Sequence, residues 1–310
     1  MTRLKSMALA TLGLTLALAA PARANETVRI VHTSSSTYMP AFVAKDLGIF
    51  TKHGLDVNFI PTAINSNIPA ALVSGSAEIG GPSTAVLIQA VDGGLDLVAI
   101  AGTGLAYPGG TNEAAVARAG SGIKTASDYI GKRVGVPGIG VITDIFFRNW
   151  LILNKVDPAK VNFAELANPM QFDALRAGTV DAVVANDPQL FRLINSGVGV
   201  EAGAFLDVLP GAIPIIVYAV TADYARTHPT TIDAFQAAHR EAVDYVMAHQ
   251  EESKAIMAKY LRLPADIVKD MEVPRYQTDV SVSQIAMMID ILKRQQAVQS
   301  NLDPGKLVFK

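Results

Sequence analysis

Short apolar runs alternate with longer stretches that begin at Ser, Asn or Pro and stop at glycine, from residue 28 to residue 101. Short β-branched runs are typical of buried strands, and stretches bounded by such capping residues are typical of helices. The pattern predicts strands at 28–33, 55–60, 77–80 and 96–101, with helices at 40–53, 65–74 and 82–91 between them. This alternation indicates a mainly parallel sheet flanked by helices.

A second series of the same kind follows a glycine-rich connection at 102–110, which contains Pro108. It predicts strands at 132–136, 161–165 and 182–185, with helices at 142–154, 170–177 and 188–195. Residues 205–214 form a second connection, a strand at 215–221 follows it, and helices are expected at 231–248, 251–260 and 283–298.

Two connections between two such series predict an α/β protein with two lobes and a hinge between them. We expect lobe 1 to comprise residues 25–108 and 215–310, and lobe 2 to comprise residues 109–214. A faint internal repeat supports similar lobes: in residues 71–78 and again in 174–181 a helix ends at a glycine, and an acid follows three residues on. Chance similarity of two helix–strand turns is the alternative.

The first two dozen residues have the pattern of a secretory signal peptide. Arg3 and Lys5 precede an apolar run that Pro21 ends, and residues 22–24 read Ala-Arg-Ala, a small-x-small cleavage site. The run is short for a bilayer span. We therefore expect export to the periplasm, with cleavage after Ala24.

Charge and cysteine content narrow the functional classes. Without residues 1–24 the chain has 23 basic and 28 acidic residues, formally −5, so nothing indicates binding to nucleic acid. The absence of cysteine excludes thiolate zinc sites and iron–sulfur clusters. It also removes the cysteine through which bacterial lipoproteins are anchored, so we expect no lipid anchor.

Several segments together resemble a known family. They are Ala-Lys-Asp-Leu-Gly-Ile-Phe at 44–50, Gly-Leu-Asp-Val at 54–57, and the segments 70–80, 131–137 and 174–181. The chain resembles the substrate-binding proteins of ABC importers for nitrate, sulfonates and taurine, a group that includes relatives of thiamine-pyrimidine synthesis proteins. The resemblance implies the type II periplasmic binding protein fold, a small-molecule ligand between the lobes, and an ABC permease with its ATPase as partners.

Candidate ligand contacts lie where strands end and helices begin, because free backbone N–H groups converge there. Ordinary helix capping is the alternative for each of them, and Asp187 in particular reads as the N-cap of a helix that starts at Pro188. For the tyrosines the alternative is core packing. The predicted ligand-binding residues are Ser34, Ser35, Ser36, Thr37, Tyr38, Asn67, Ser83, Thr84, Gly138, Gly140, Thr143, Asn186, Asp187 and Tyr218.

Other chemistry fits the sequence less well. Gly138 and Gly140 open a helix as a dinucleotide loop would, but Thr143 stands where that motif has its third glycine. No metal-ligand spacing or nucleophile motif occurs, so we predict no catalytic residue, no metal and no cofactor. The alternative function is an enzyme on the same fold, either pyrimidine-synthesis-like or dehydratase-like. The pyrimidine-synthesising relatives use a cysteine-rich segment that this chain lacks.

We therefore predict a monomeric solute-binding protein that catalyses nothing. Its ligand is expected to be a small organic anion, a carboxylate or sulfonate, held by helix N-termini rather than by an arginine. Arg133 alternates with strand residues and Arg148 lies well inside a helix, so neither is an obvious clamp.

The first prediction concerns processing. The exported protein should begin at Asn25, because the small-x-small site ends at Ala24. Edman sequencing of protein recovered from the periplasm decides this, and a retained Met1 would contradict both cleavage and the predicted location.

Overall fold

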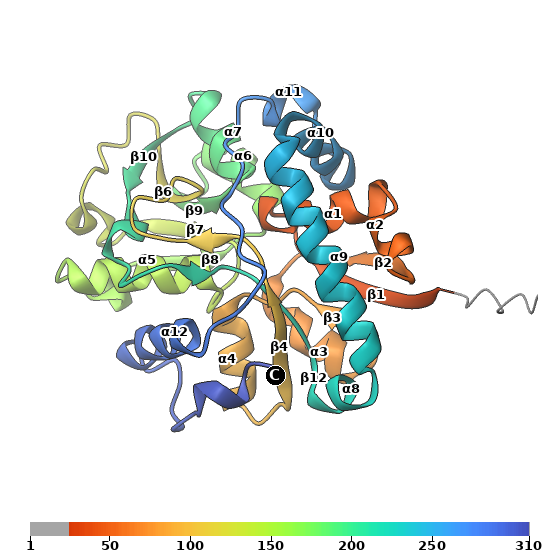
Figure 1. Ribbon diagram of the computed structural model, residues 1–310. Coiled ribbons are helices and arrows are strands. Elements are labelled where there is room, and N and C mark those ends of the chain that lie inside the picture. Colours follow the sequence, from red (N-terminus) through yellow and green to blue (C-terminus); the bar gives the residue numbers. More distant parts are fainter. Residues whose placement is uncertain (1–24, 310) are drawn as a thin grey trace, which may run out of the picture.

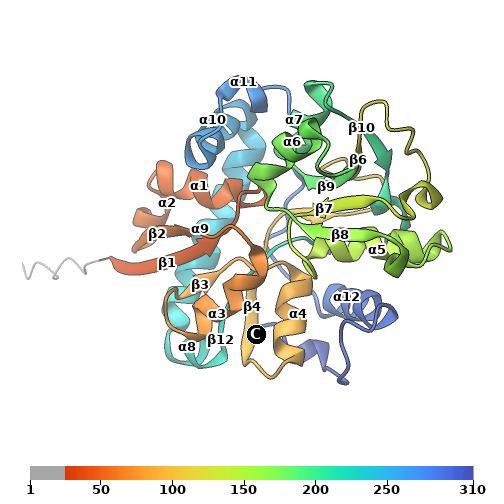
Figure 2. The same cartoon turned by 180° about the vertical axis from the view of Figure 1, so that it is seen from behind.

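The computed structural model describes residues 25–309, without the side chains of residues 265 and 266. The predicted signal peptide lies outside the described residues, so its cleavage stays a prediction. The chain forms two five-stranded sheets flanked by helices, side by side in Figures 1 and 2. The predicted α/β class with two mainly parallel sheets is confirmed, and we call the parts built on the two sheets lobe 1 and lobe 2.

Both sheets have the same strand order. Lobe 1 has the order β2-β1-β3-β12-β4, and lobe 2 has the order β8-β7-β9-β6-β10. In each, four strands run in one direction and one, β12 or β6, is antiparallel to both of its neighbours. The strands are β1 (Glu26–His32), β2 (Leu55–Pro61), β3 (Ile79–Gly80), β4 (Leu97–Gly102), β6 (Glu113–Arg118), β7 (Arg133–Val136), β8 (Asn162–Glu165), β9 (Ala182–Asn186), β10 (Gly199–Gly203) and β12 (Val217–Thr221).

Helices cover both faces of each sheet. Strand β12 shows the two faces of the first sheet: Tyr218 and Val220 pack in the large core with α1 and α9, whereas Val217 and Ala219 pack with α3 and α4. In lobe 2, α5 lies on one face, and α6 and α7 lie on the other. The helices are α1 (Met39–Asp46), α2 (Ile49–Lys52), α3 (Ile68–Val73), α4 (Thr84–Asp92), α5 (Ile142–Leu153), α6 (Asn168–Ala177), α7 (Gln189–Asn195), α8 (Ala222–Thr227), α9 (Pro229–Ala248), α10 (Gln250–Leu261), α11 (Ala265–Val268) and α12 (Val282–Arg294).

The two connections between the lobes pair with each other. Strand β5 (Leu105–Ala106) in the first pairs with β11 (Ile213–Pro214) in the second, as a two-stranded antiparallel link. A third segment, which leads from α11 to α12, runs beside them: Leu105 donates its N–H to the Arg275 carbonyl at 2.8 Å. Helix α12 contacts α4 of lobe 1 and α5 of lobe 2. The lobe boundaries given above stay a prediction.

Several sequence expectations differ from the structure. The expected helix at 40–53 is divided into α1 and α2, because Gly48 adopts a left-handed φ of 70°. Strands β6 and β10 were not predicted; β6 reads Glu-Ala-Ala-Val-Ala-Arg, and alanine and glutamate are poor strand formers. Helix α7 begins at Gln189 with Pro188 as its N-cap, one residue later than expected.

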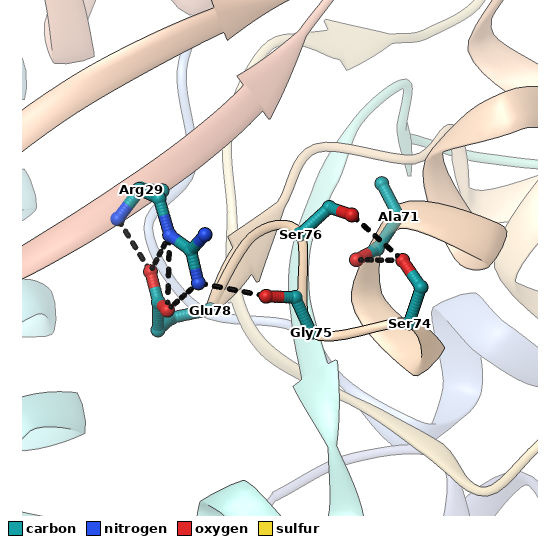
Figure 3. Close-up of polar contacts among 6 residues, drawn as sticks. All are labelled: Arg29, Ala71, Ser74, Gly75, Ser76 and Glu78. Atoms are coloured by element: carbon teal, nitrogen blue, oxygen red, sulfur yellow. Dashed lines mark hydrogen bonds and ion pairs between the residues drawn. The ribbon is translucent and has the colours of Figure 1, made fainter.

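The faint internal repeat corresponds to equivalent acids in the two lobes. Glu78 precedes β3 and accepts the backbone N–H of Arg29 on β1 at 2.7 Å, while it also binds the Arg29 guanidinium (Figure 3). Asp181 precedes β9 and accepts the backbone N–H of Arg133 on β7 at 2.9 Å. Glu78 thus joins β3 to β1, and Asp181 joins β9 to β7.

The two acids differ in one respect: Glu78 also pairs with the Arg29 guanidinium, whereas Asp181 accepts a backbone N–H. This difference can be tested by mutation. Glu78→Ala should lower the midpoint of thermal unfolding by about 2–4 °C, because it leaves the Arg29 backbone N–H without its acceptor and removes the carboxylate paired with the Arg29 guanidinium. Asp181→Ala is the matched variant and should cost less, since it removes only the backbone contact. Scanning calorimetry measures both midpoints. Equal losses would show that the Arg29 guanidinium contributes nothing.

Candidate ligand-binding cleft

A small cavity lies where the carboxyl ends of the parallel strands of both sheets face each other. It measures about 40 Å³, room for a few water molecules. Hydroxyl, amide and apolar side chains from both lobes enclose it. The lining residues are Thr33, Ser35, Ala63, Asn65, Ser83, Pro137, Val141, Ile142, Thr143, Asn168, Asn186, Ile215 and Ile216.

The lobe 1 wall is organised around Asn65, which lies in a short 3-10 turn (Asn65–Asn67) after β2. Its amide oxygen accepts the Ser83 N–H at 2.7 Å, and its amide nitrogen donates to the Gly81 carbonyl at 3.1 Å. Ser83 in turn caps α4, with its hydroxyl accepting from Val86 N at 3.2 Å. Asn65 therefore fixes the position from which Ser83 faces the cavity.

Lobe 2 meets this wall directly through hydrogen bonds across the cleft. Asn168, at the start of α6, donates to the Ser34 carbonyl at 2.8 Å, and the Asn186 amide contacts the Ser35 hydroxyl at 3.0 Å. The first N–H of α5, from Ile142, reaches the Ser83 hydroxyl at 3.3 Å. These contacts show the lobes closed on one another.

Two buried carboxyl groups lie behind the lobe 2 wall. Glu113 is the first residue of β6 and pairs with Asn186 on β9; its Oε1 accepts from the Thr143 hydroxyl at 3.1 Å. Burial raises the pKa of Glu113 to about 8, and the charge of Asp187 adds to this. Burial likewise raises the pKa of Asp187 to about 7, although its carboxylate accepts the Phe191 N–H at 3.1 Å.

The structure brings some of the predicted site residues together and not others. Ser35, Ser83, Thr143 and Asn186 line the cavity. A second set lies next to the lining and supports it: Ser34, Ser36, Thr37, Tyr38, Thr84, Gly138, Gly140 and Asp187.

Two predicted residues lie elsewhere. Asn67 is exposed, because the turn after β2 points Asn65 rather than Asn67 at the cavity. Tyr218 is fully buried between Tyr38, Phe235 and His239, which is the core packing that stood as its alternative.

Sequence reasoning missed Thr33, Asn65, Asn168 and Glu113. Thr33 was expected as the last residue of a strand and Asn65 as part of a helix cap, and Asn168 precedes Pro169 at a helix start, a detectable signal. Glu113 carried no signal, because its strand was not predicted.

Residues 25–309 contain neither a cluster of potential metal ligands nor a membrane-spanning helix. Among them no group of three or more His, Cys, Asp or Glu side chains could hold a metal ion. No helix in this range is long and apolar enough to cross a membrane.

Comparison of the sequence with known proteins gives a family and a curated relative. A family model described as NMT1/THI5 like matches residues 35–253. The nitrate import ATP-binding protein NrtC of Synechocystis is 25% identical over 242 residues, which cover 73% of this chain. The match spans only 35% of that relative's own length.

Comparison of the structure gives the same fold in solved proteins. The alkanesulfonate-binding protein SsuA from Xanthomonas axonopodis, bound to MOPS, has a TM-score of 0.78 at 18% identity and covers 93% of this chain and 99% of its own. SsuA from Escherichia coli has a TM-score of 0.74 at 21% identity, covering 91% and 97%. The nitrate-binding protein NrtA from Synechocystis has a TM-score of 0.77 at 16% identity, covering 90% and 84%.

The buried Glu113 carboxyl predicts a dependence of stability on pH. Its pKa rises from 4.5 in the unfolded chain to about 8 in the folded protein, so its contribution to folding is complete below about pH 4.5 and is lost as the pH rises towards 8. Glu113→Gln should remove this loss, which amounts to a few kcal/mol.

Urea unfolding of the ligand-free protein at pH 5, 7 and 8.5 measures the effect. Asp187→Asn is the matched variant; it should remove the separate loss that runs from about pH 3.8 and is complete near pH 7. A wild-type stability that does not fall between pH 5 and 8.5 would contradict the assignment.

Proposed function

Because the chain belongs to the NMT1/THI5-like family, we propose that it is the solute-binding component of an ABC importer. In this role it captures a small molecule between its lobes and delivers it to a permease and its ATPase. The observation that carries the proposal is the polar cavity enclosed by both lobes, whose walls are joined by hydrogen bonds across the cleft. Solved proteins with this fold are named for binding alkanesulfonate or nitrate.

The location and state of the protein belong to the same proposal. It acts in the periplasm as a monomer, after export through the cleaved signal peptide and without a lipid anchor. Several relatives in the solved structures are described as periplasmic.

An enzyme on the same fold is less well supported. The lining offers hydroxyl, amide and apolar groups, so it does not supply a nucleophile beside a basic group.

Closure of the lobes is the proposed mechanism. Besides the contacts within the cavity, Gln89 of α4 donates to the Gly140 carbonyl of lobe 2 at 2.7 Å. The backbone N–H of Ser36 donates to the Asp187 carbonyl at 3.0 Å. A solute that contacts both walls binds the closed form better than the open form and shifts the population towards it. The paired strands β5 and β11 provide the hinge.

We retain the proposal that the solute carries an anionic group, but the structure changes how that group would be held. The N–H groups of Ser83, Thr84 and Ile142 already have acceptors in the closed form: Asn65, Ile215 and Ser83, respectively. The Ile142 contact is the longest of them, at 3.3 Å. An anion would therefore replace the Ser83 hydroxyl at the N-terminus of α5 and accept from that hydroxyl, whereas the Thr143 hydroxyl is already donated to Glu113.

Gln89 gives a test of closure away from the cavity lining. Gln89→Leu should weaken binding of the solute recovered from the native protein by about 2- to 10-fold, because the closed form loses one hydrogen bond. Gln236→Leu is the matched control; Gln236 donates to the Ile100 carbonyl within lobe 1, so affinity should be unchanged.

Calorimetry gives the affinities and solution X-ray scattering gives the radius of gyration. Wild-type protein should contract when saturated with the solute. Binding with an unchanged radius of gyration would overturn the proposed mechanism.

A further inference from the structure

Buried hydrogen-bond acceptors without a donor cluster on the lobe 2 side of the cavity. Asn168 and Asn186 line the cavity and are 7% and 9% exposed, and within residues 25–309 no donor reaches the Oδ1 atom of either. Glu113, directly behind them, is 2% exposed, and its Oε2 also has no partner in the described chain. A buried polar atom left without a partner is costly, so such a cluster indicates a missing donor.

The orientation of the Asn168 amide follows from its neighbour. Its Nδ2 donates at 2.8 Å to the Ser34 carbonyl, which can only accept. The oxygen of Asn168 is therefore the atom left for the cavity, whichever way the amide is first drawn.

Glu113 extends this acceptor face. It lies opposite Asn186 in the antiparallel β6–β9 pair, and directly opposed side chains lie on the same face of a sheet. Thr143, which lines the cavity, occupies only Oε1 of the carboxyl. The second oxygen stays unpaired on the same face of the sheet as Asn186.

Positive charge from the protein does not balance this face. The cavity lining includes no lysine or arginine. Two cations that contact α5, the helix that carries Thr143, are engaged there: Arg148 pairs with Asp144 at 2.7 Å, and Arg294 donates to Asn149 at 2.7 Å. A protonated Glu113 offers a single O–H, so at least one of the two asparagine oxygens still needs a donor from outside the described residues.

We propose that the solute presents a nitrogen group with several N–H donors, an amine, to the acceptor face formed by Asn168, Asn186 and Glu113. The inference rests on the proposed function. It specifies a second chemical group on the solute, in addition to the anionic group proposed above. An ammonium group satisfies three acceptors at once, whereas a hydroxyl has one hydrogen to donate.

The protonation of Glu113 supplies an independent readout. Because its pKa is about 8 when the cavity is empty, the carboxyl is mostly protonated at pH 7. Thr143 of α5 and Asn186 of β9 face it, Asp187 acts on it through its charge, and Glu272 acts on Asp187 in turn. An ammonium group beside Glu113 favours the carboxylate, so amine binding should release a proton.

Four small probes separate the two ends of the solute: propionate, 3-aminopropionate, propionamide and 3-aminopropionamide. Calorimetry at pH 7 should show each amine binding about tenfold or more tightly than its amine-free partner. The enthalpy of amine binding should differ between two buffers of low and high ionisation enthalpy, neither of them a primary amine, such as phosphate and triethanolamine, which reports the released proton. The acid–amide comparison in the same panel tests the anionic end separately.

Glu113→Gln is the decisive variant, because it keeps an oxygen for Thr143 and replaces the free acceptor with an N–H donor. It should reduce the advantage of the amines to less than about threefold and abolish the buffer dependence. Glu201→Gln is the control: it removes a negative charge from an exposed position of β10 in the same lobe and should change neither. Circular dichroism and thermal unfolding establish that both variants are folded.

Each outcome bears on the inference. Equal affinities within both pairs, no binding by either amine, or an amine advantage that survives Glu113→Gln would overturn it. Amine binding that depends on Glu113 but leaves the radius of gyration unchanged would support the acceptor face and contradict the proposed closure.

Discussion

The pairing of β5 with β11 is the constraint on which the arrangement of the molecule depends. The chain enters each lobe from this link, so the strand that follows each connection, β6 or β12, starts at the side of its sheet that faces the other lobe. The parallel strands end at that same side, and β6 and β12 are therefore antiparallel to them. Both sheets consequently present their carboxyl ends and the N-termini of the following helices to a common cleft. The polar side chains from the two lobes converge because of this topology.

The polar groups of the cleft are unevenly distributed between donors and acceptors. On lobe 1, Asn65 uses both of its polar atoms within its own wall, and Ser83 is held as the cap of α4. On lobe 2, the amides of Asn168 and Asn186 use their nitrogens across the cleft and leave their oxygens unpaired. Lobe 1 thus provides a satisfied, rigid wall, whereas lobe 2 carries the unfilled hydrogen-bonding capacity.

The sheets and connections could be predicted from the sequence where strands are rich in valine and isoleucine, because short runs of these residues are typical of buried strands. The sequence did not reveal β6, whose alanines are buried because α5 covers one face of the sheet and α7 the other. Because β6 was not predicted, Glu113 at its start was not identified as a candidate residue. Successive side chains of a strand point to opposite faces of the sheet, so Tyr218 and Val217 on β12 lie on different faces. This rule does not predict which of the two faces lies next to a cavity. Asn65 and Asn67 differ only through the geometry of one 3-10 turn, which residue types do not determine.

The unpaired oxygens also decide how closure depends on the solute. In an open form, water hydrates Asn168 and Asn186, and closure without a solute removes that water at a cost of about 1–3 kcal/mol for each unpaired group. The direct contacts across the cleft, such as Gln89 to Gly140 and Asn168 to Ser34, each return only about 0.5–1.5 kcal/mol. These opposing contributions are of similar size, so under the proposed mechanism the open and closed forms of the empty protein would differ little in free energy. A solute that donates to the acceptor face pairs the asparagine oxygens, so closure keeps the free energy of the cross-cleft hydrogen bonds without the desolvation cost. Such a solute binds the closed form more tightly than the open form and shifts the equilibrium towards closure.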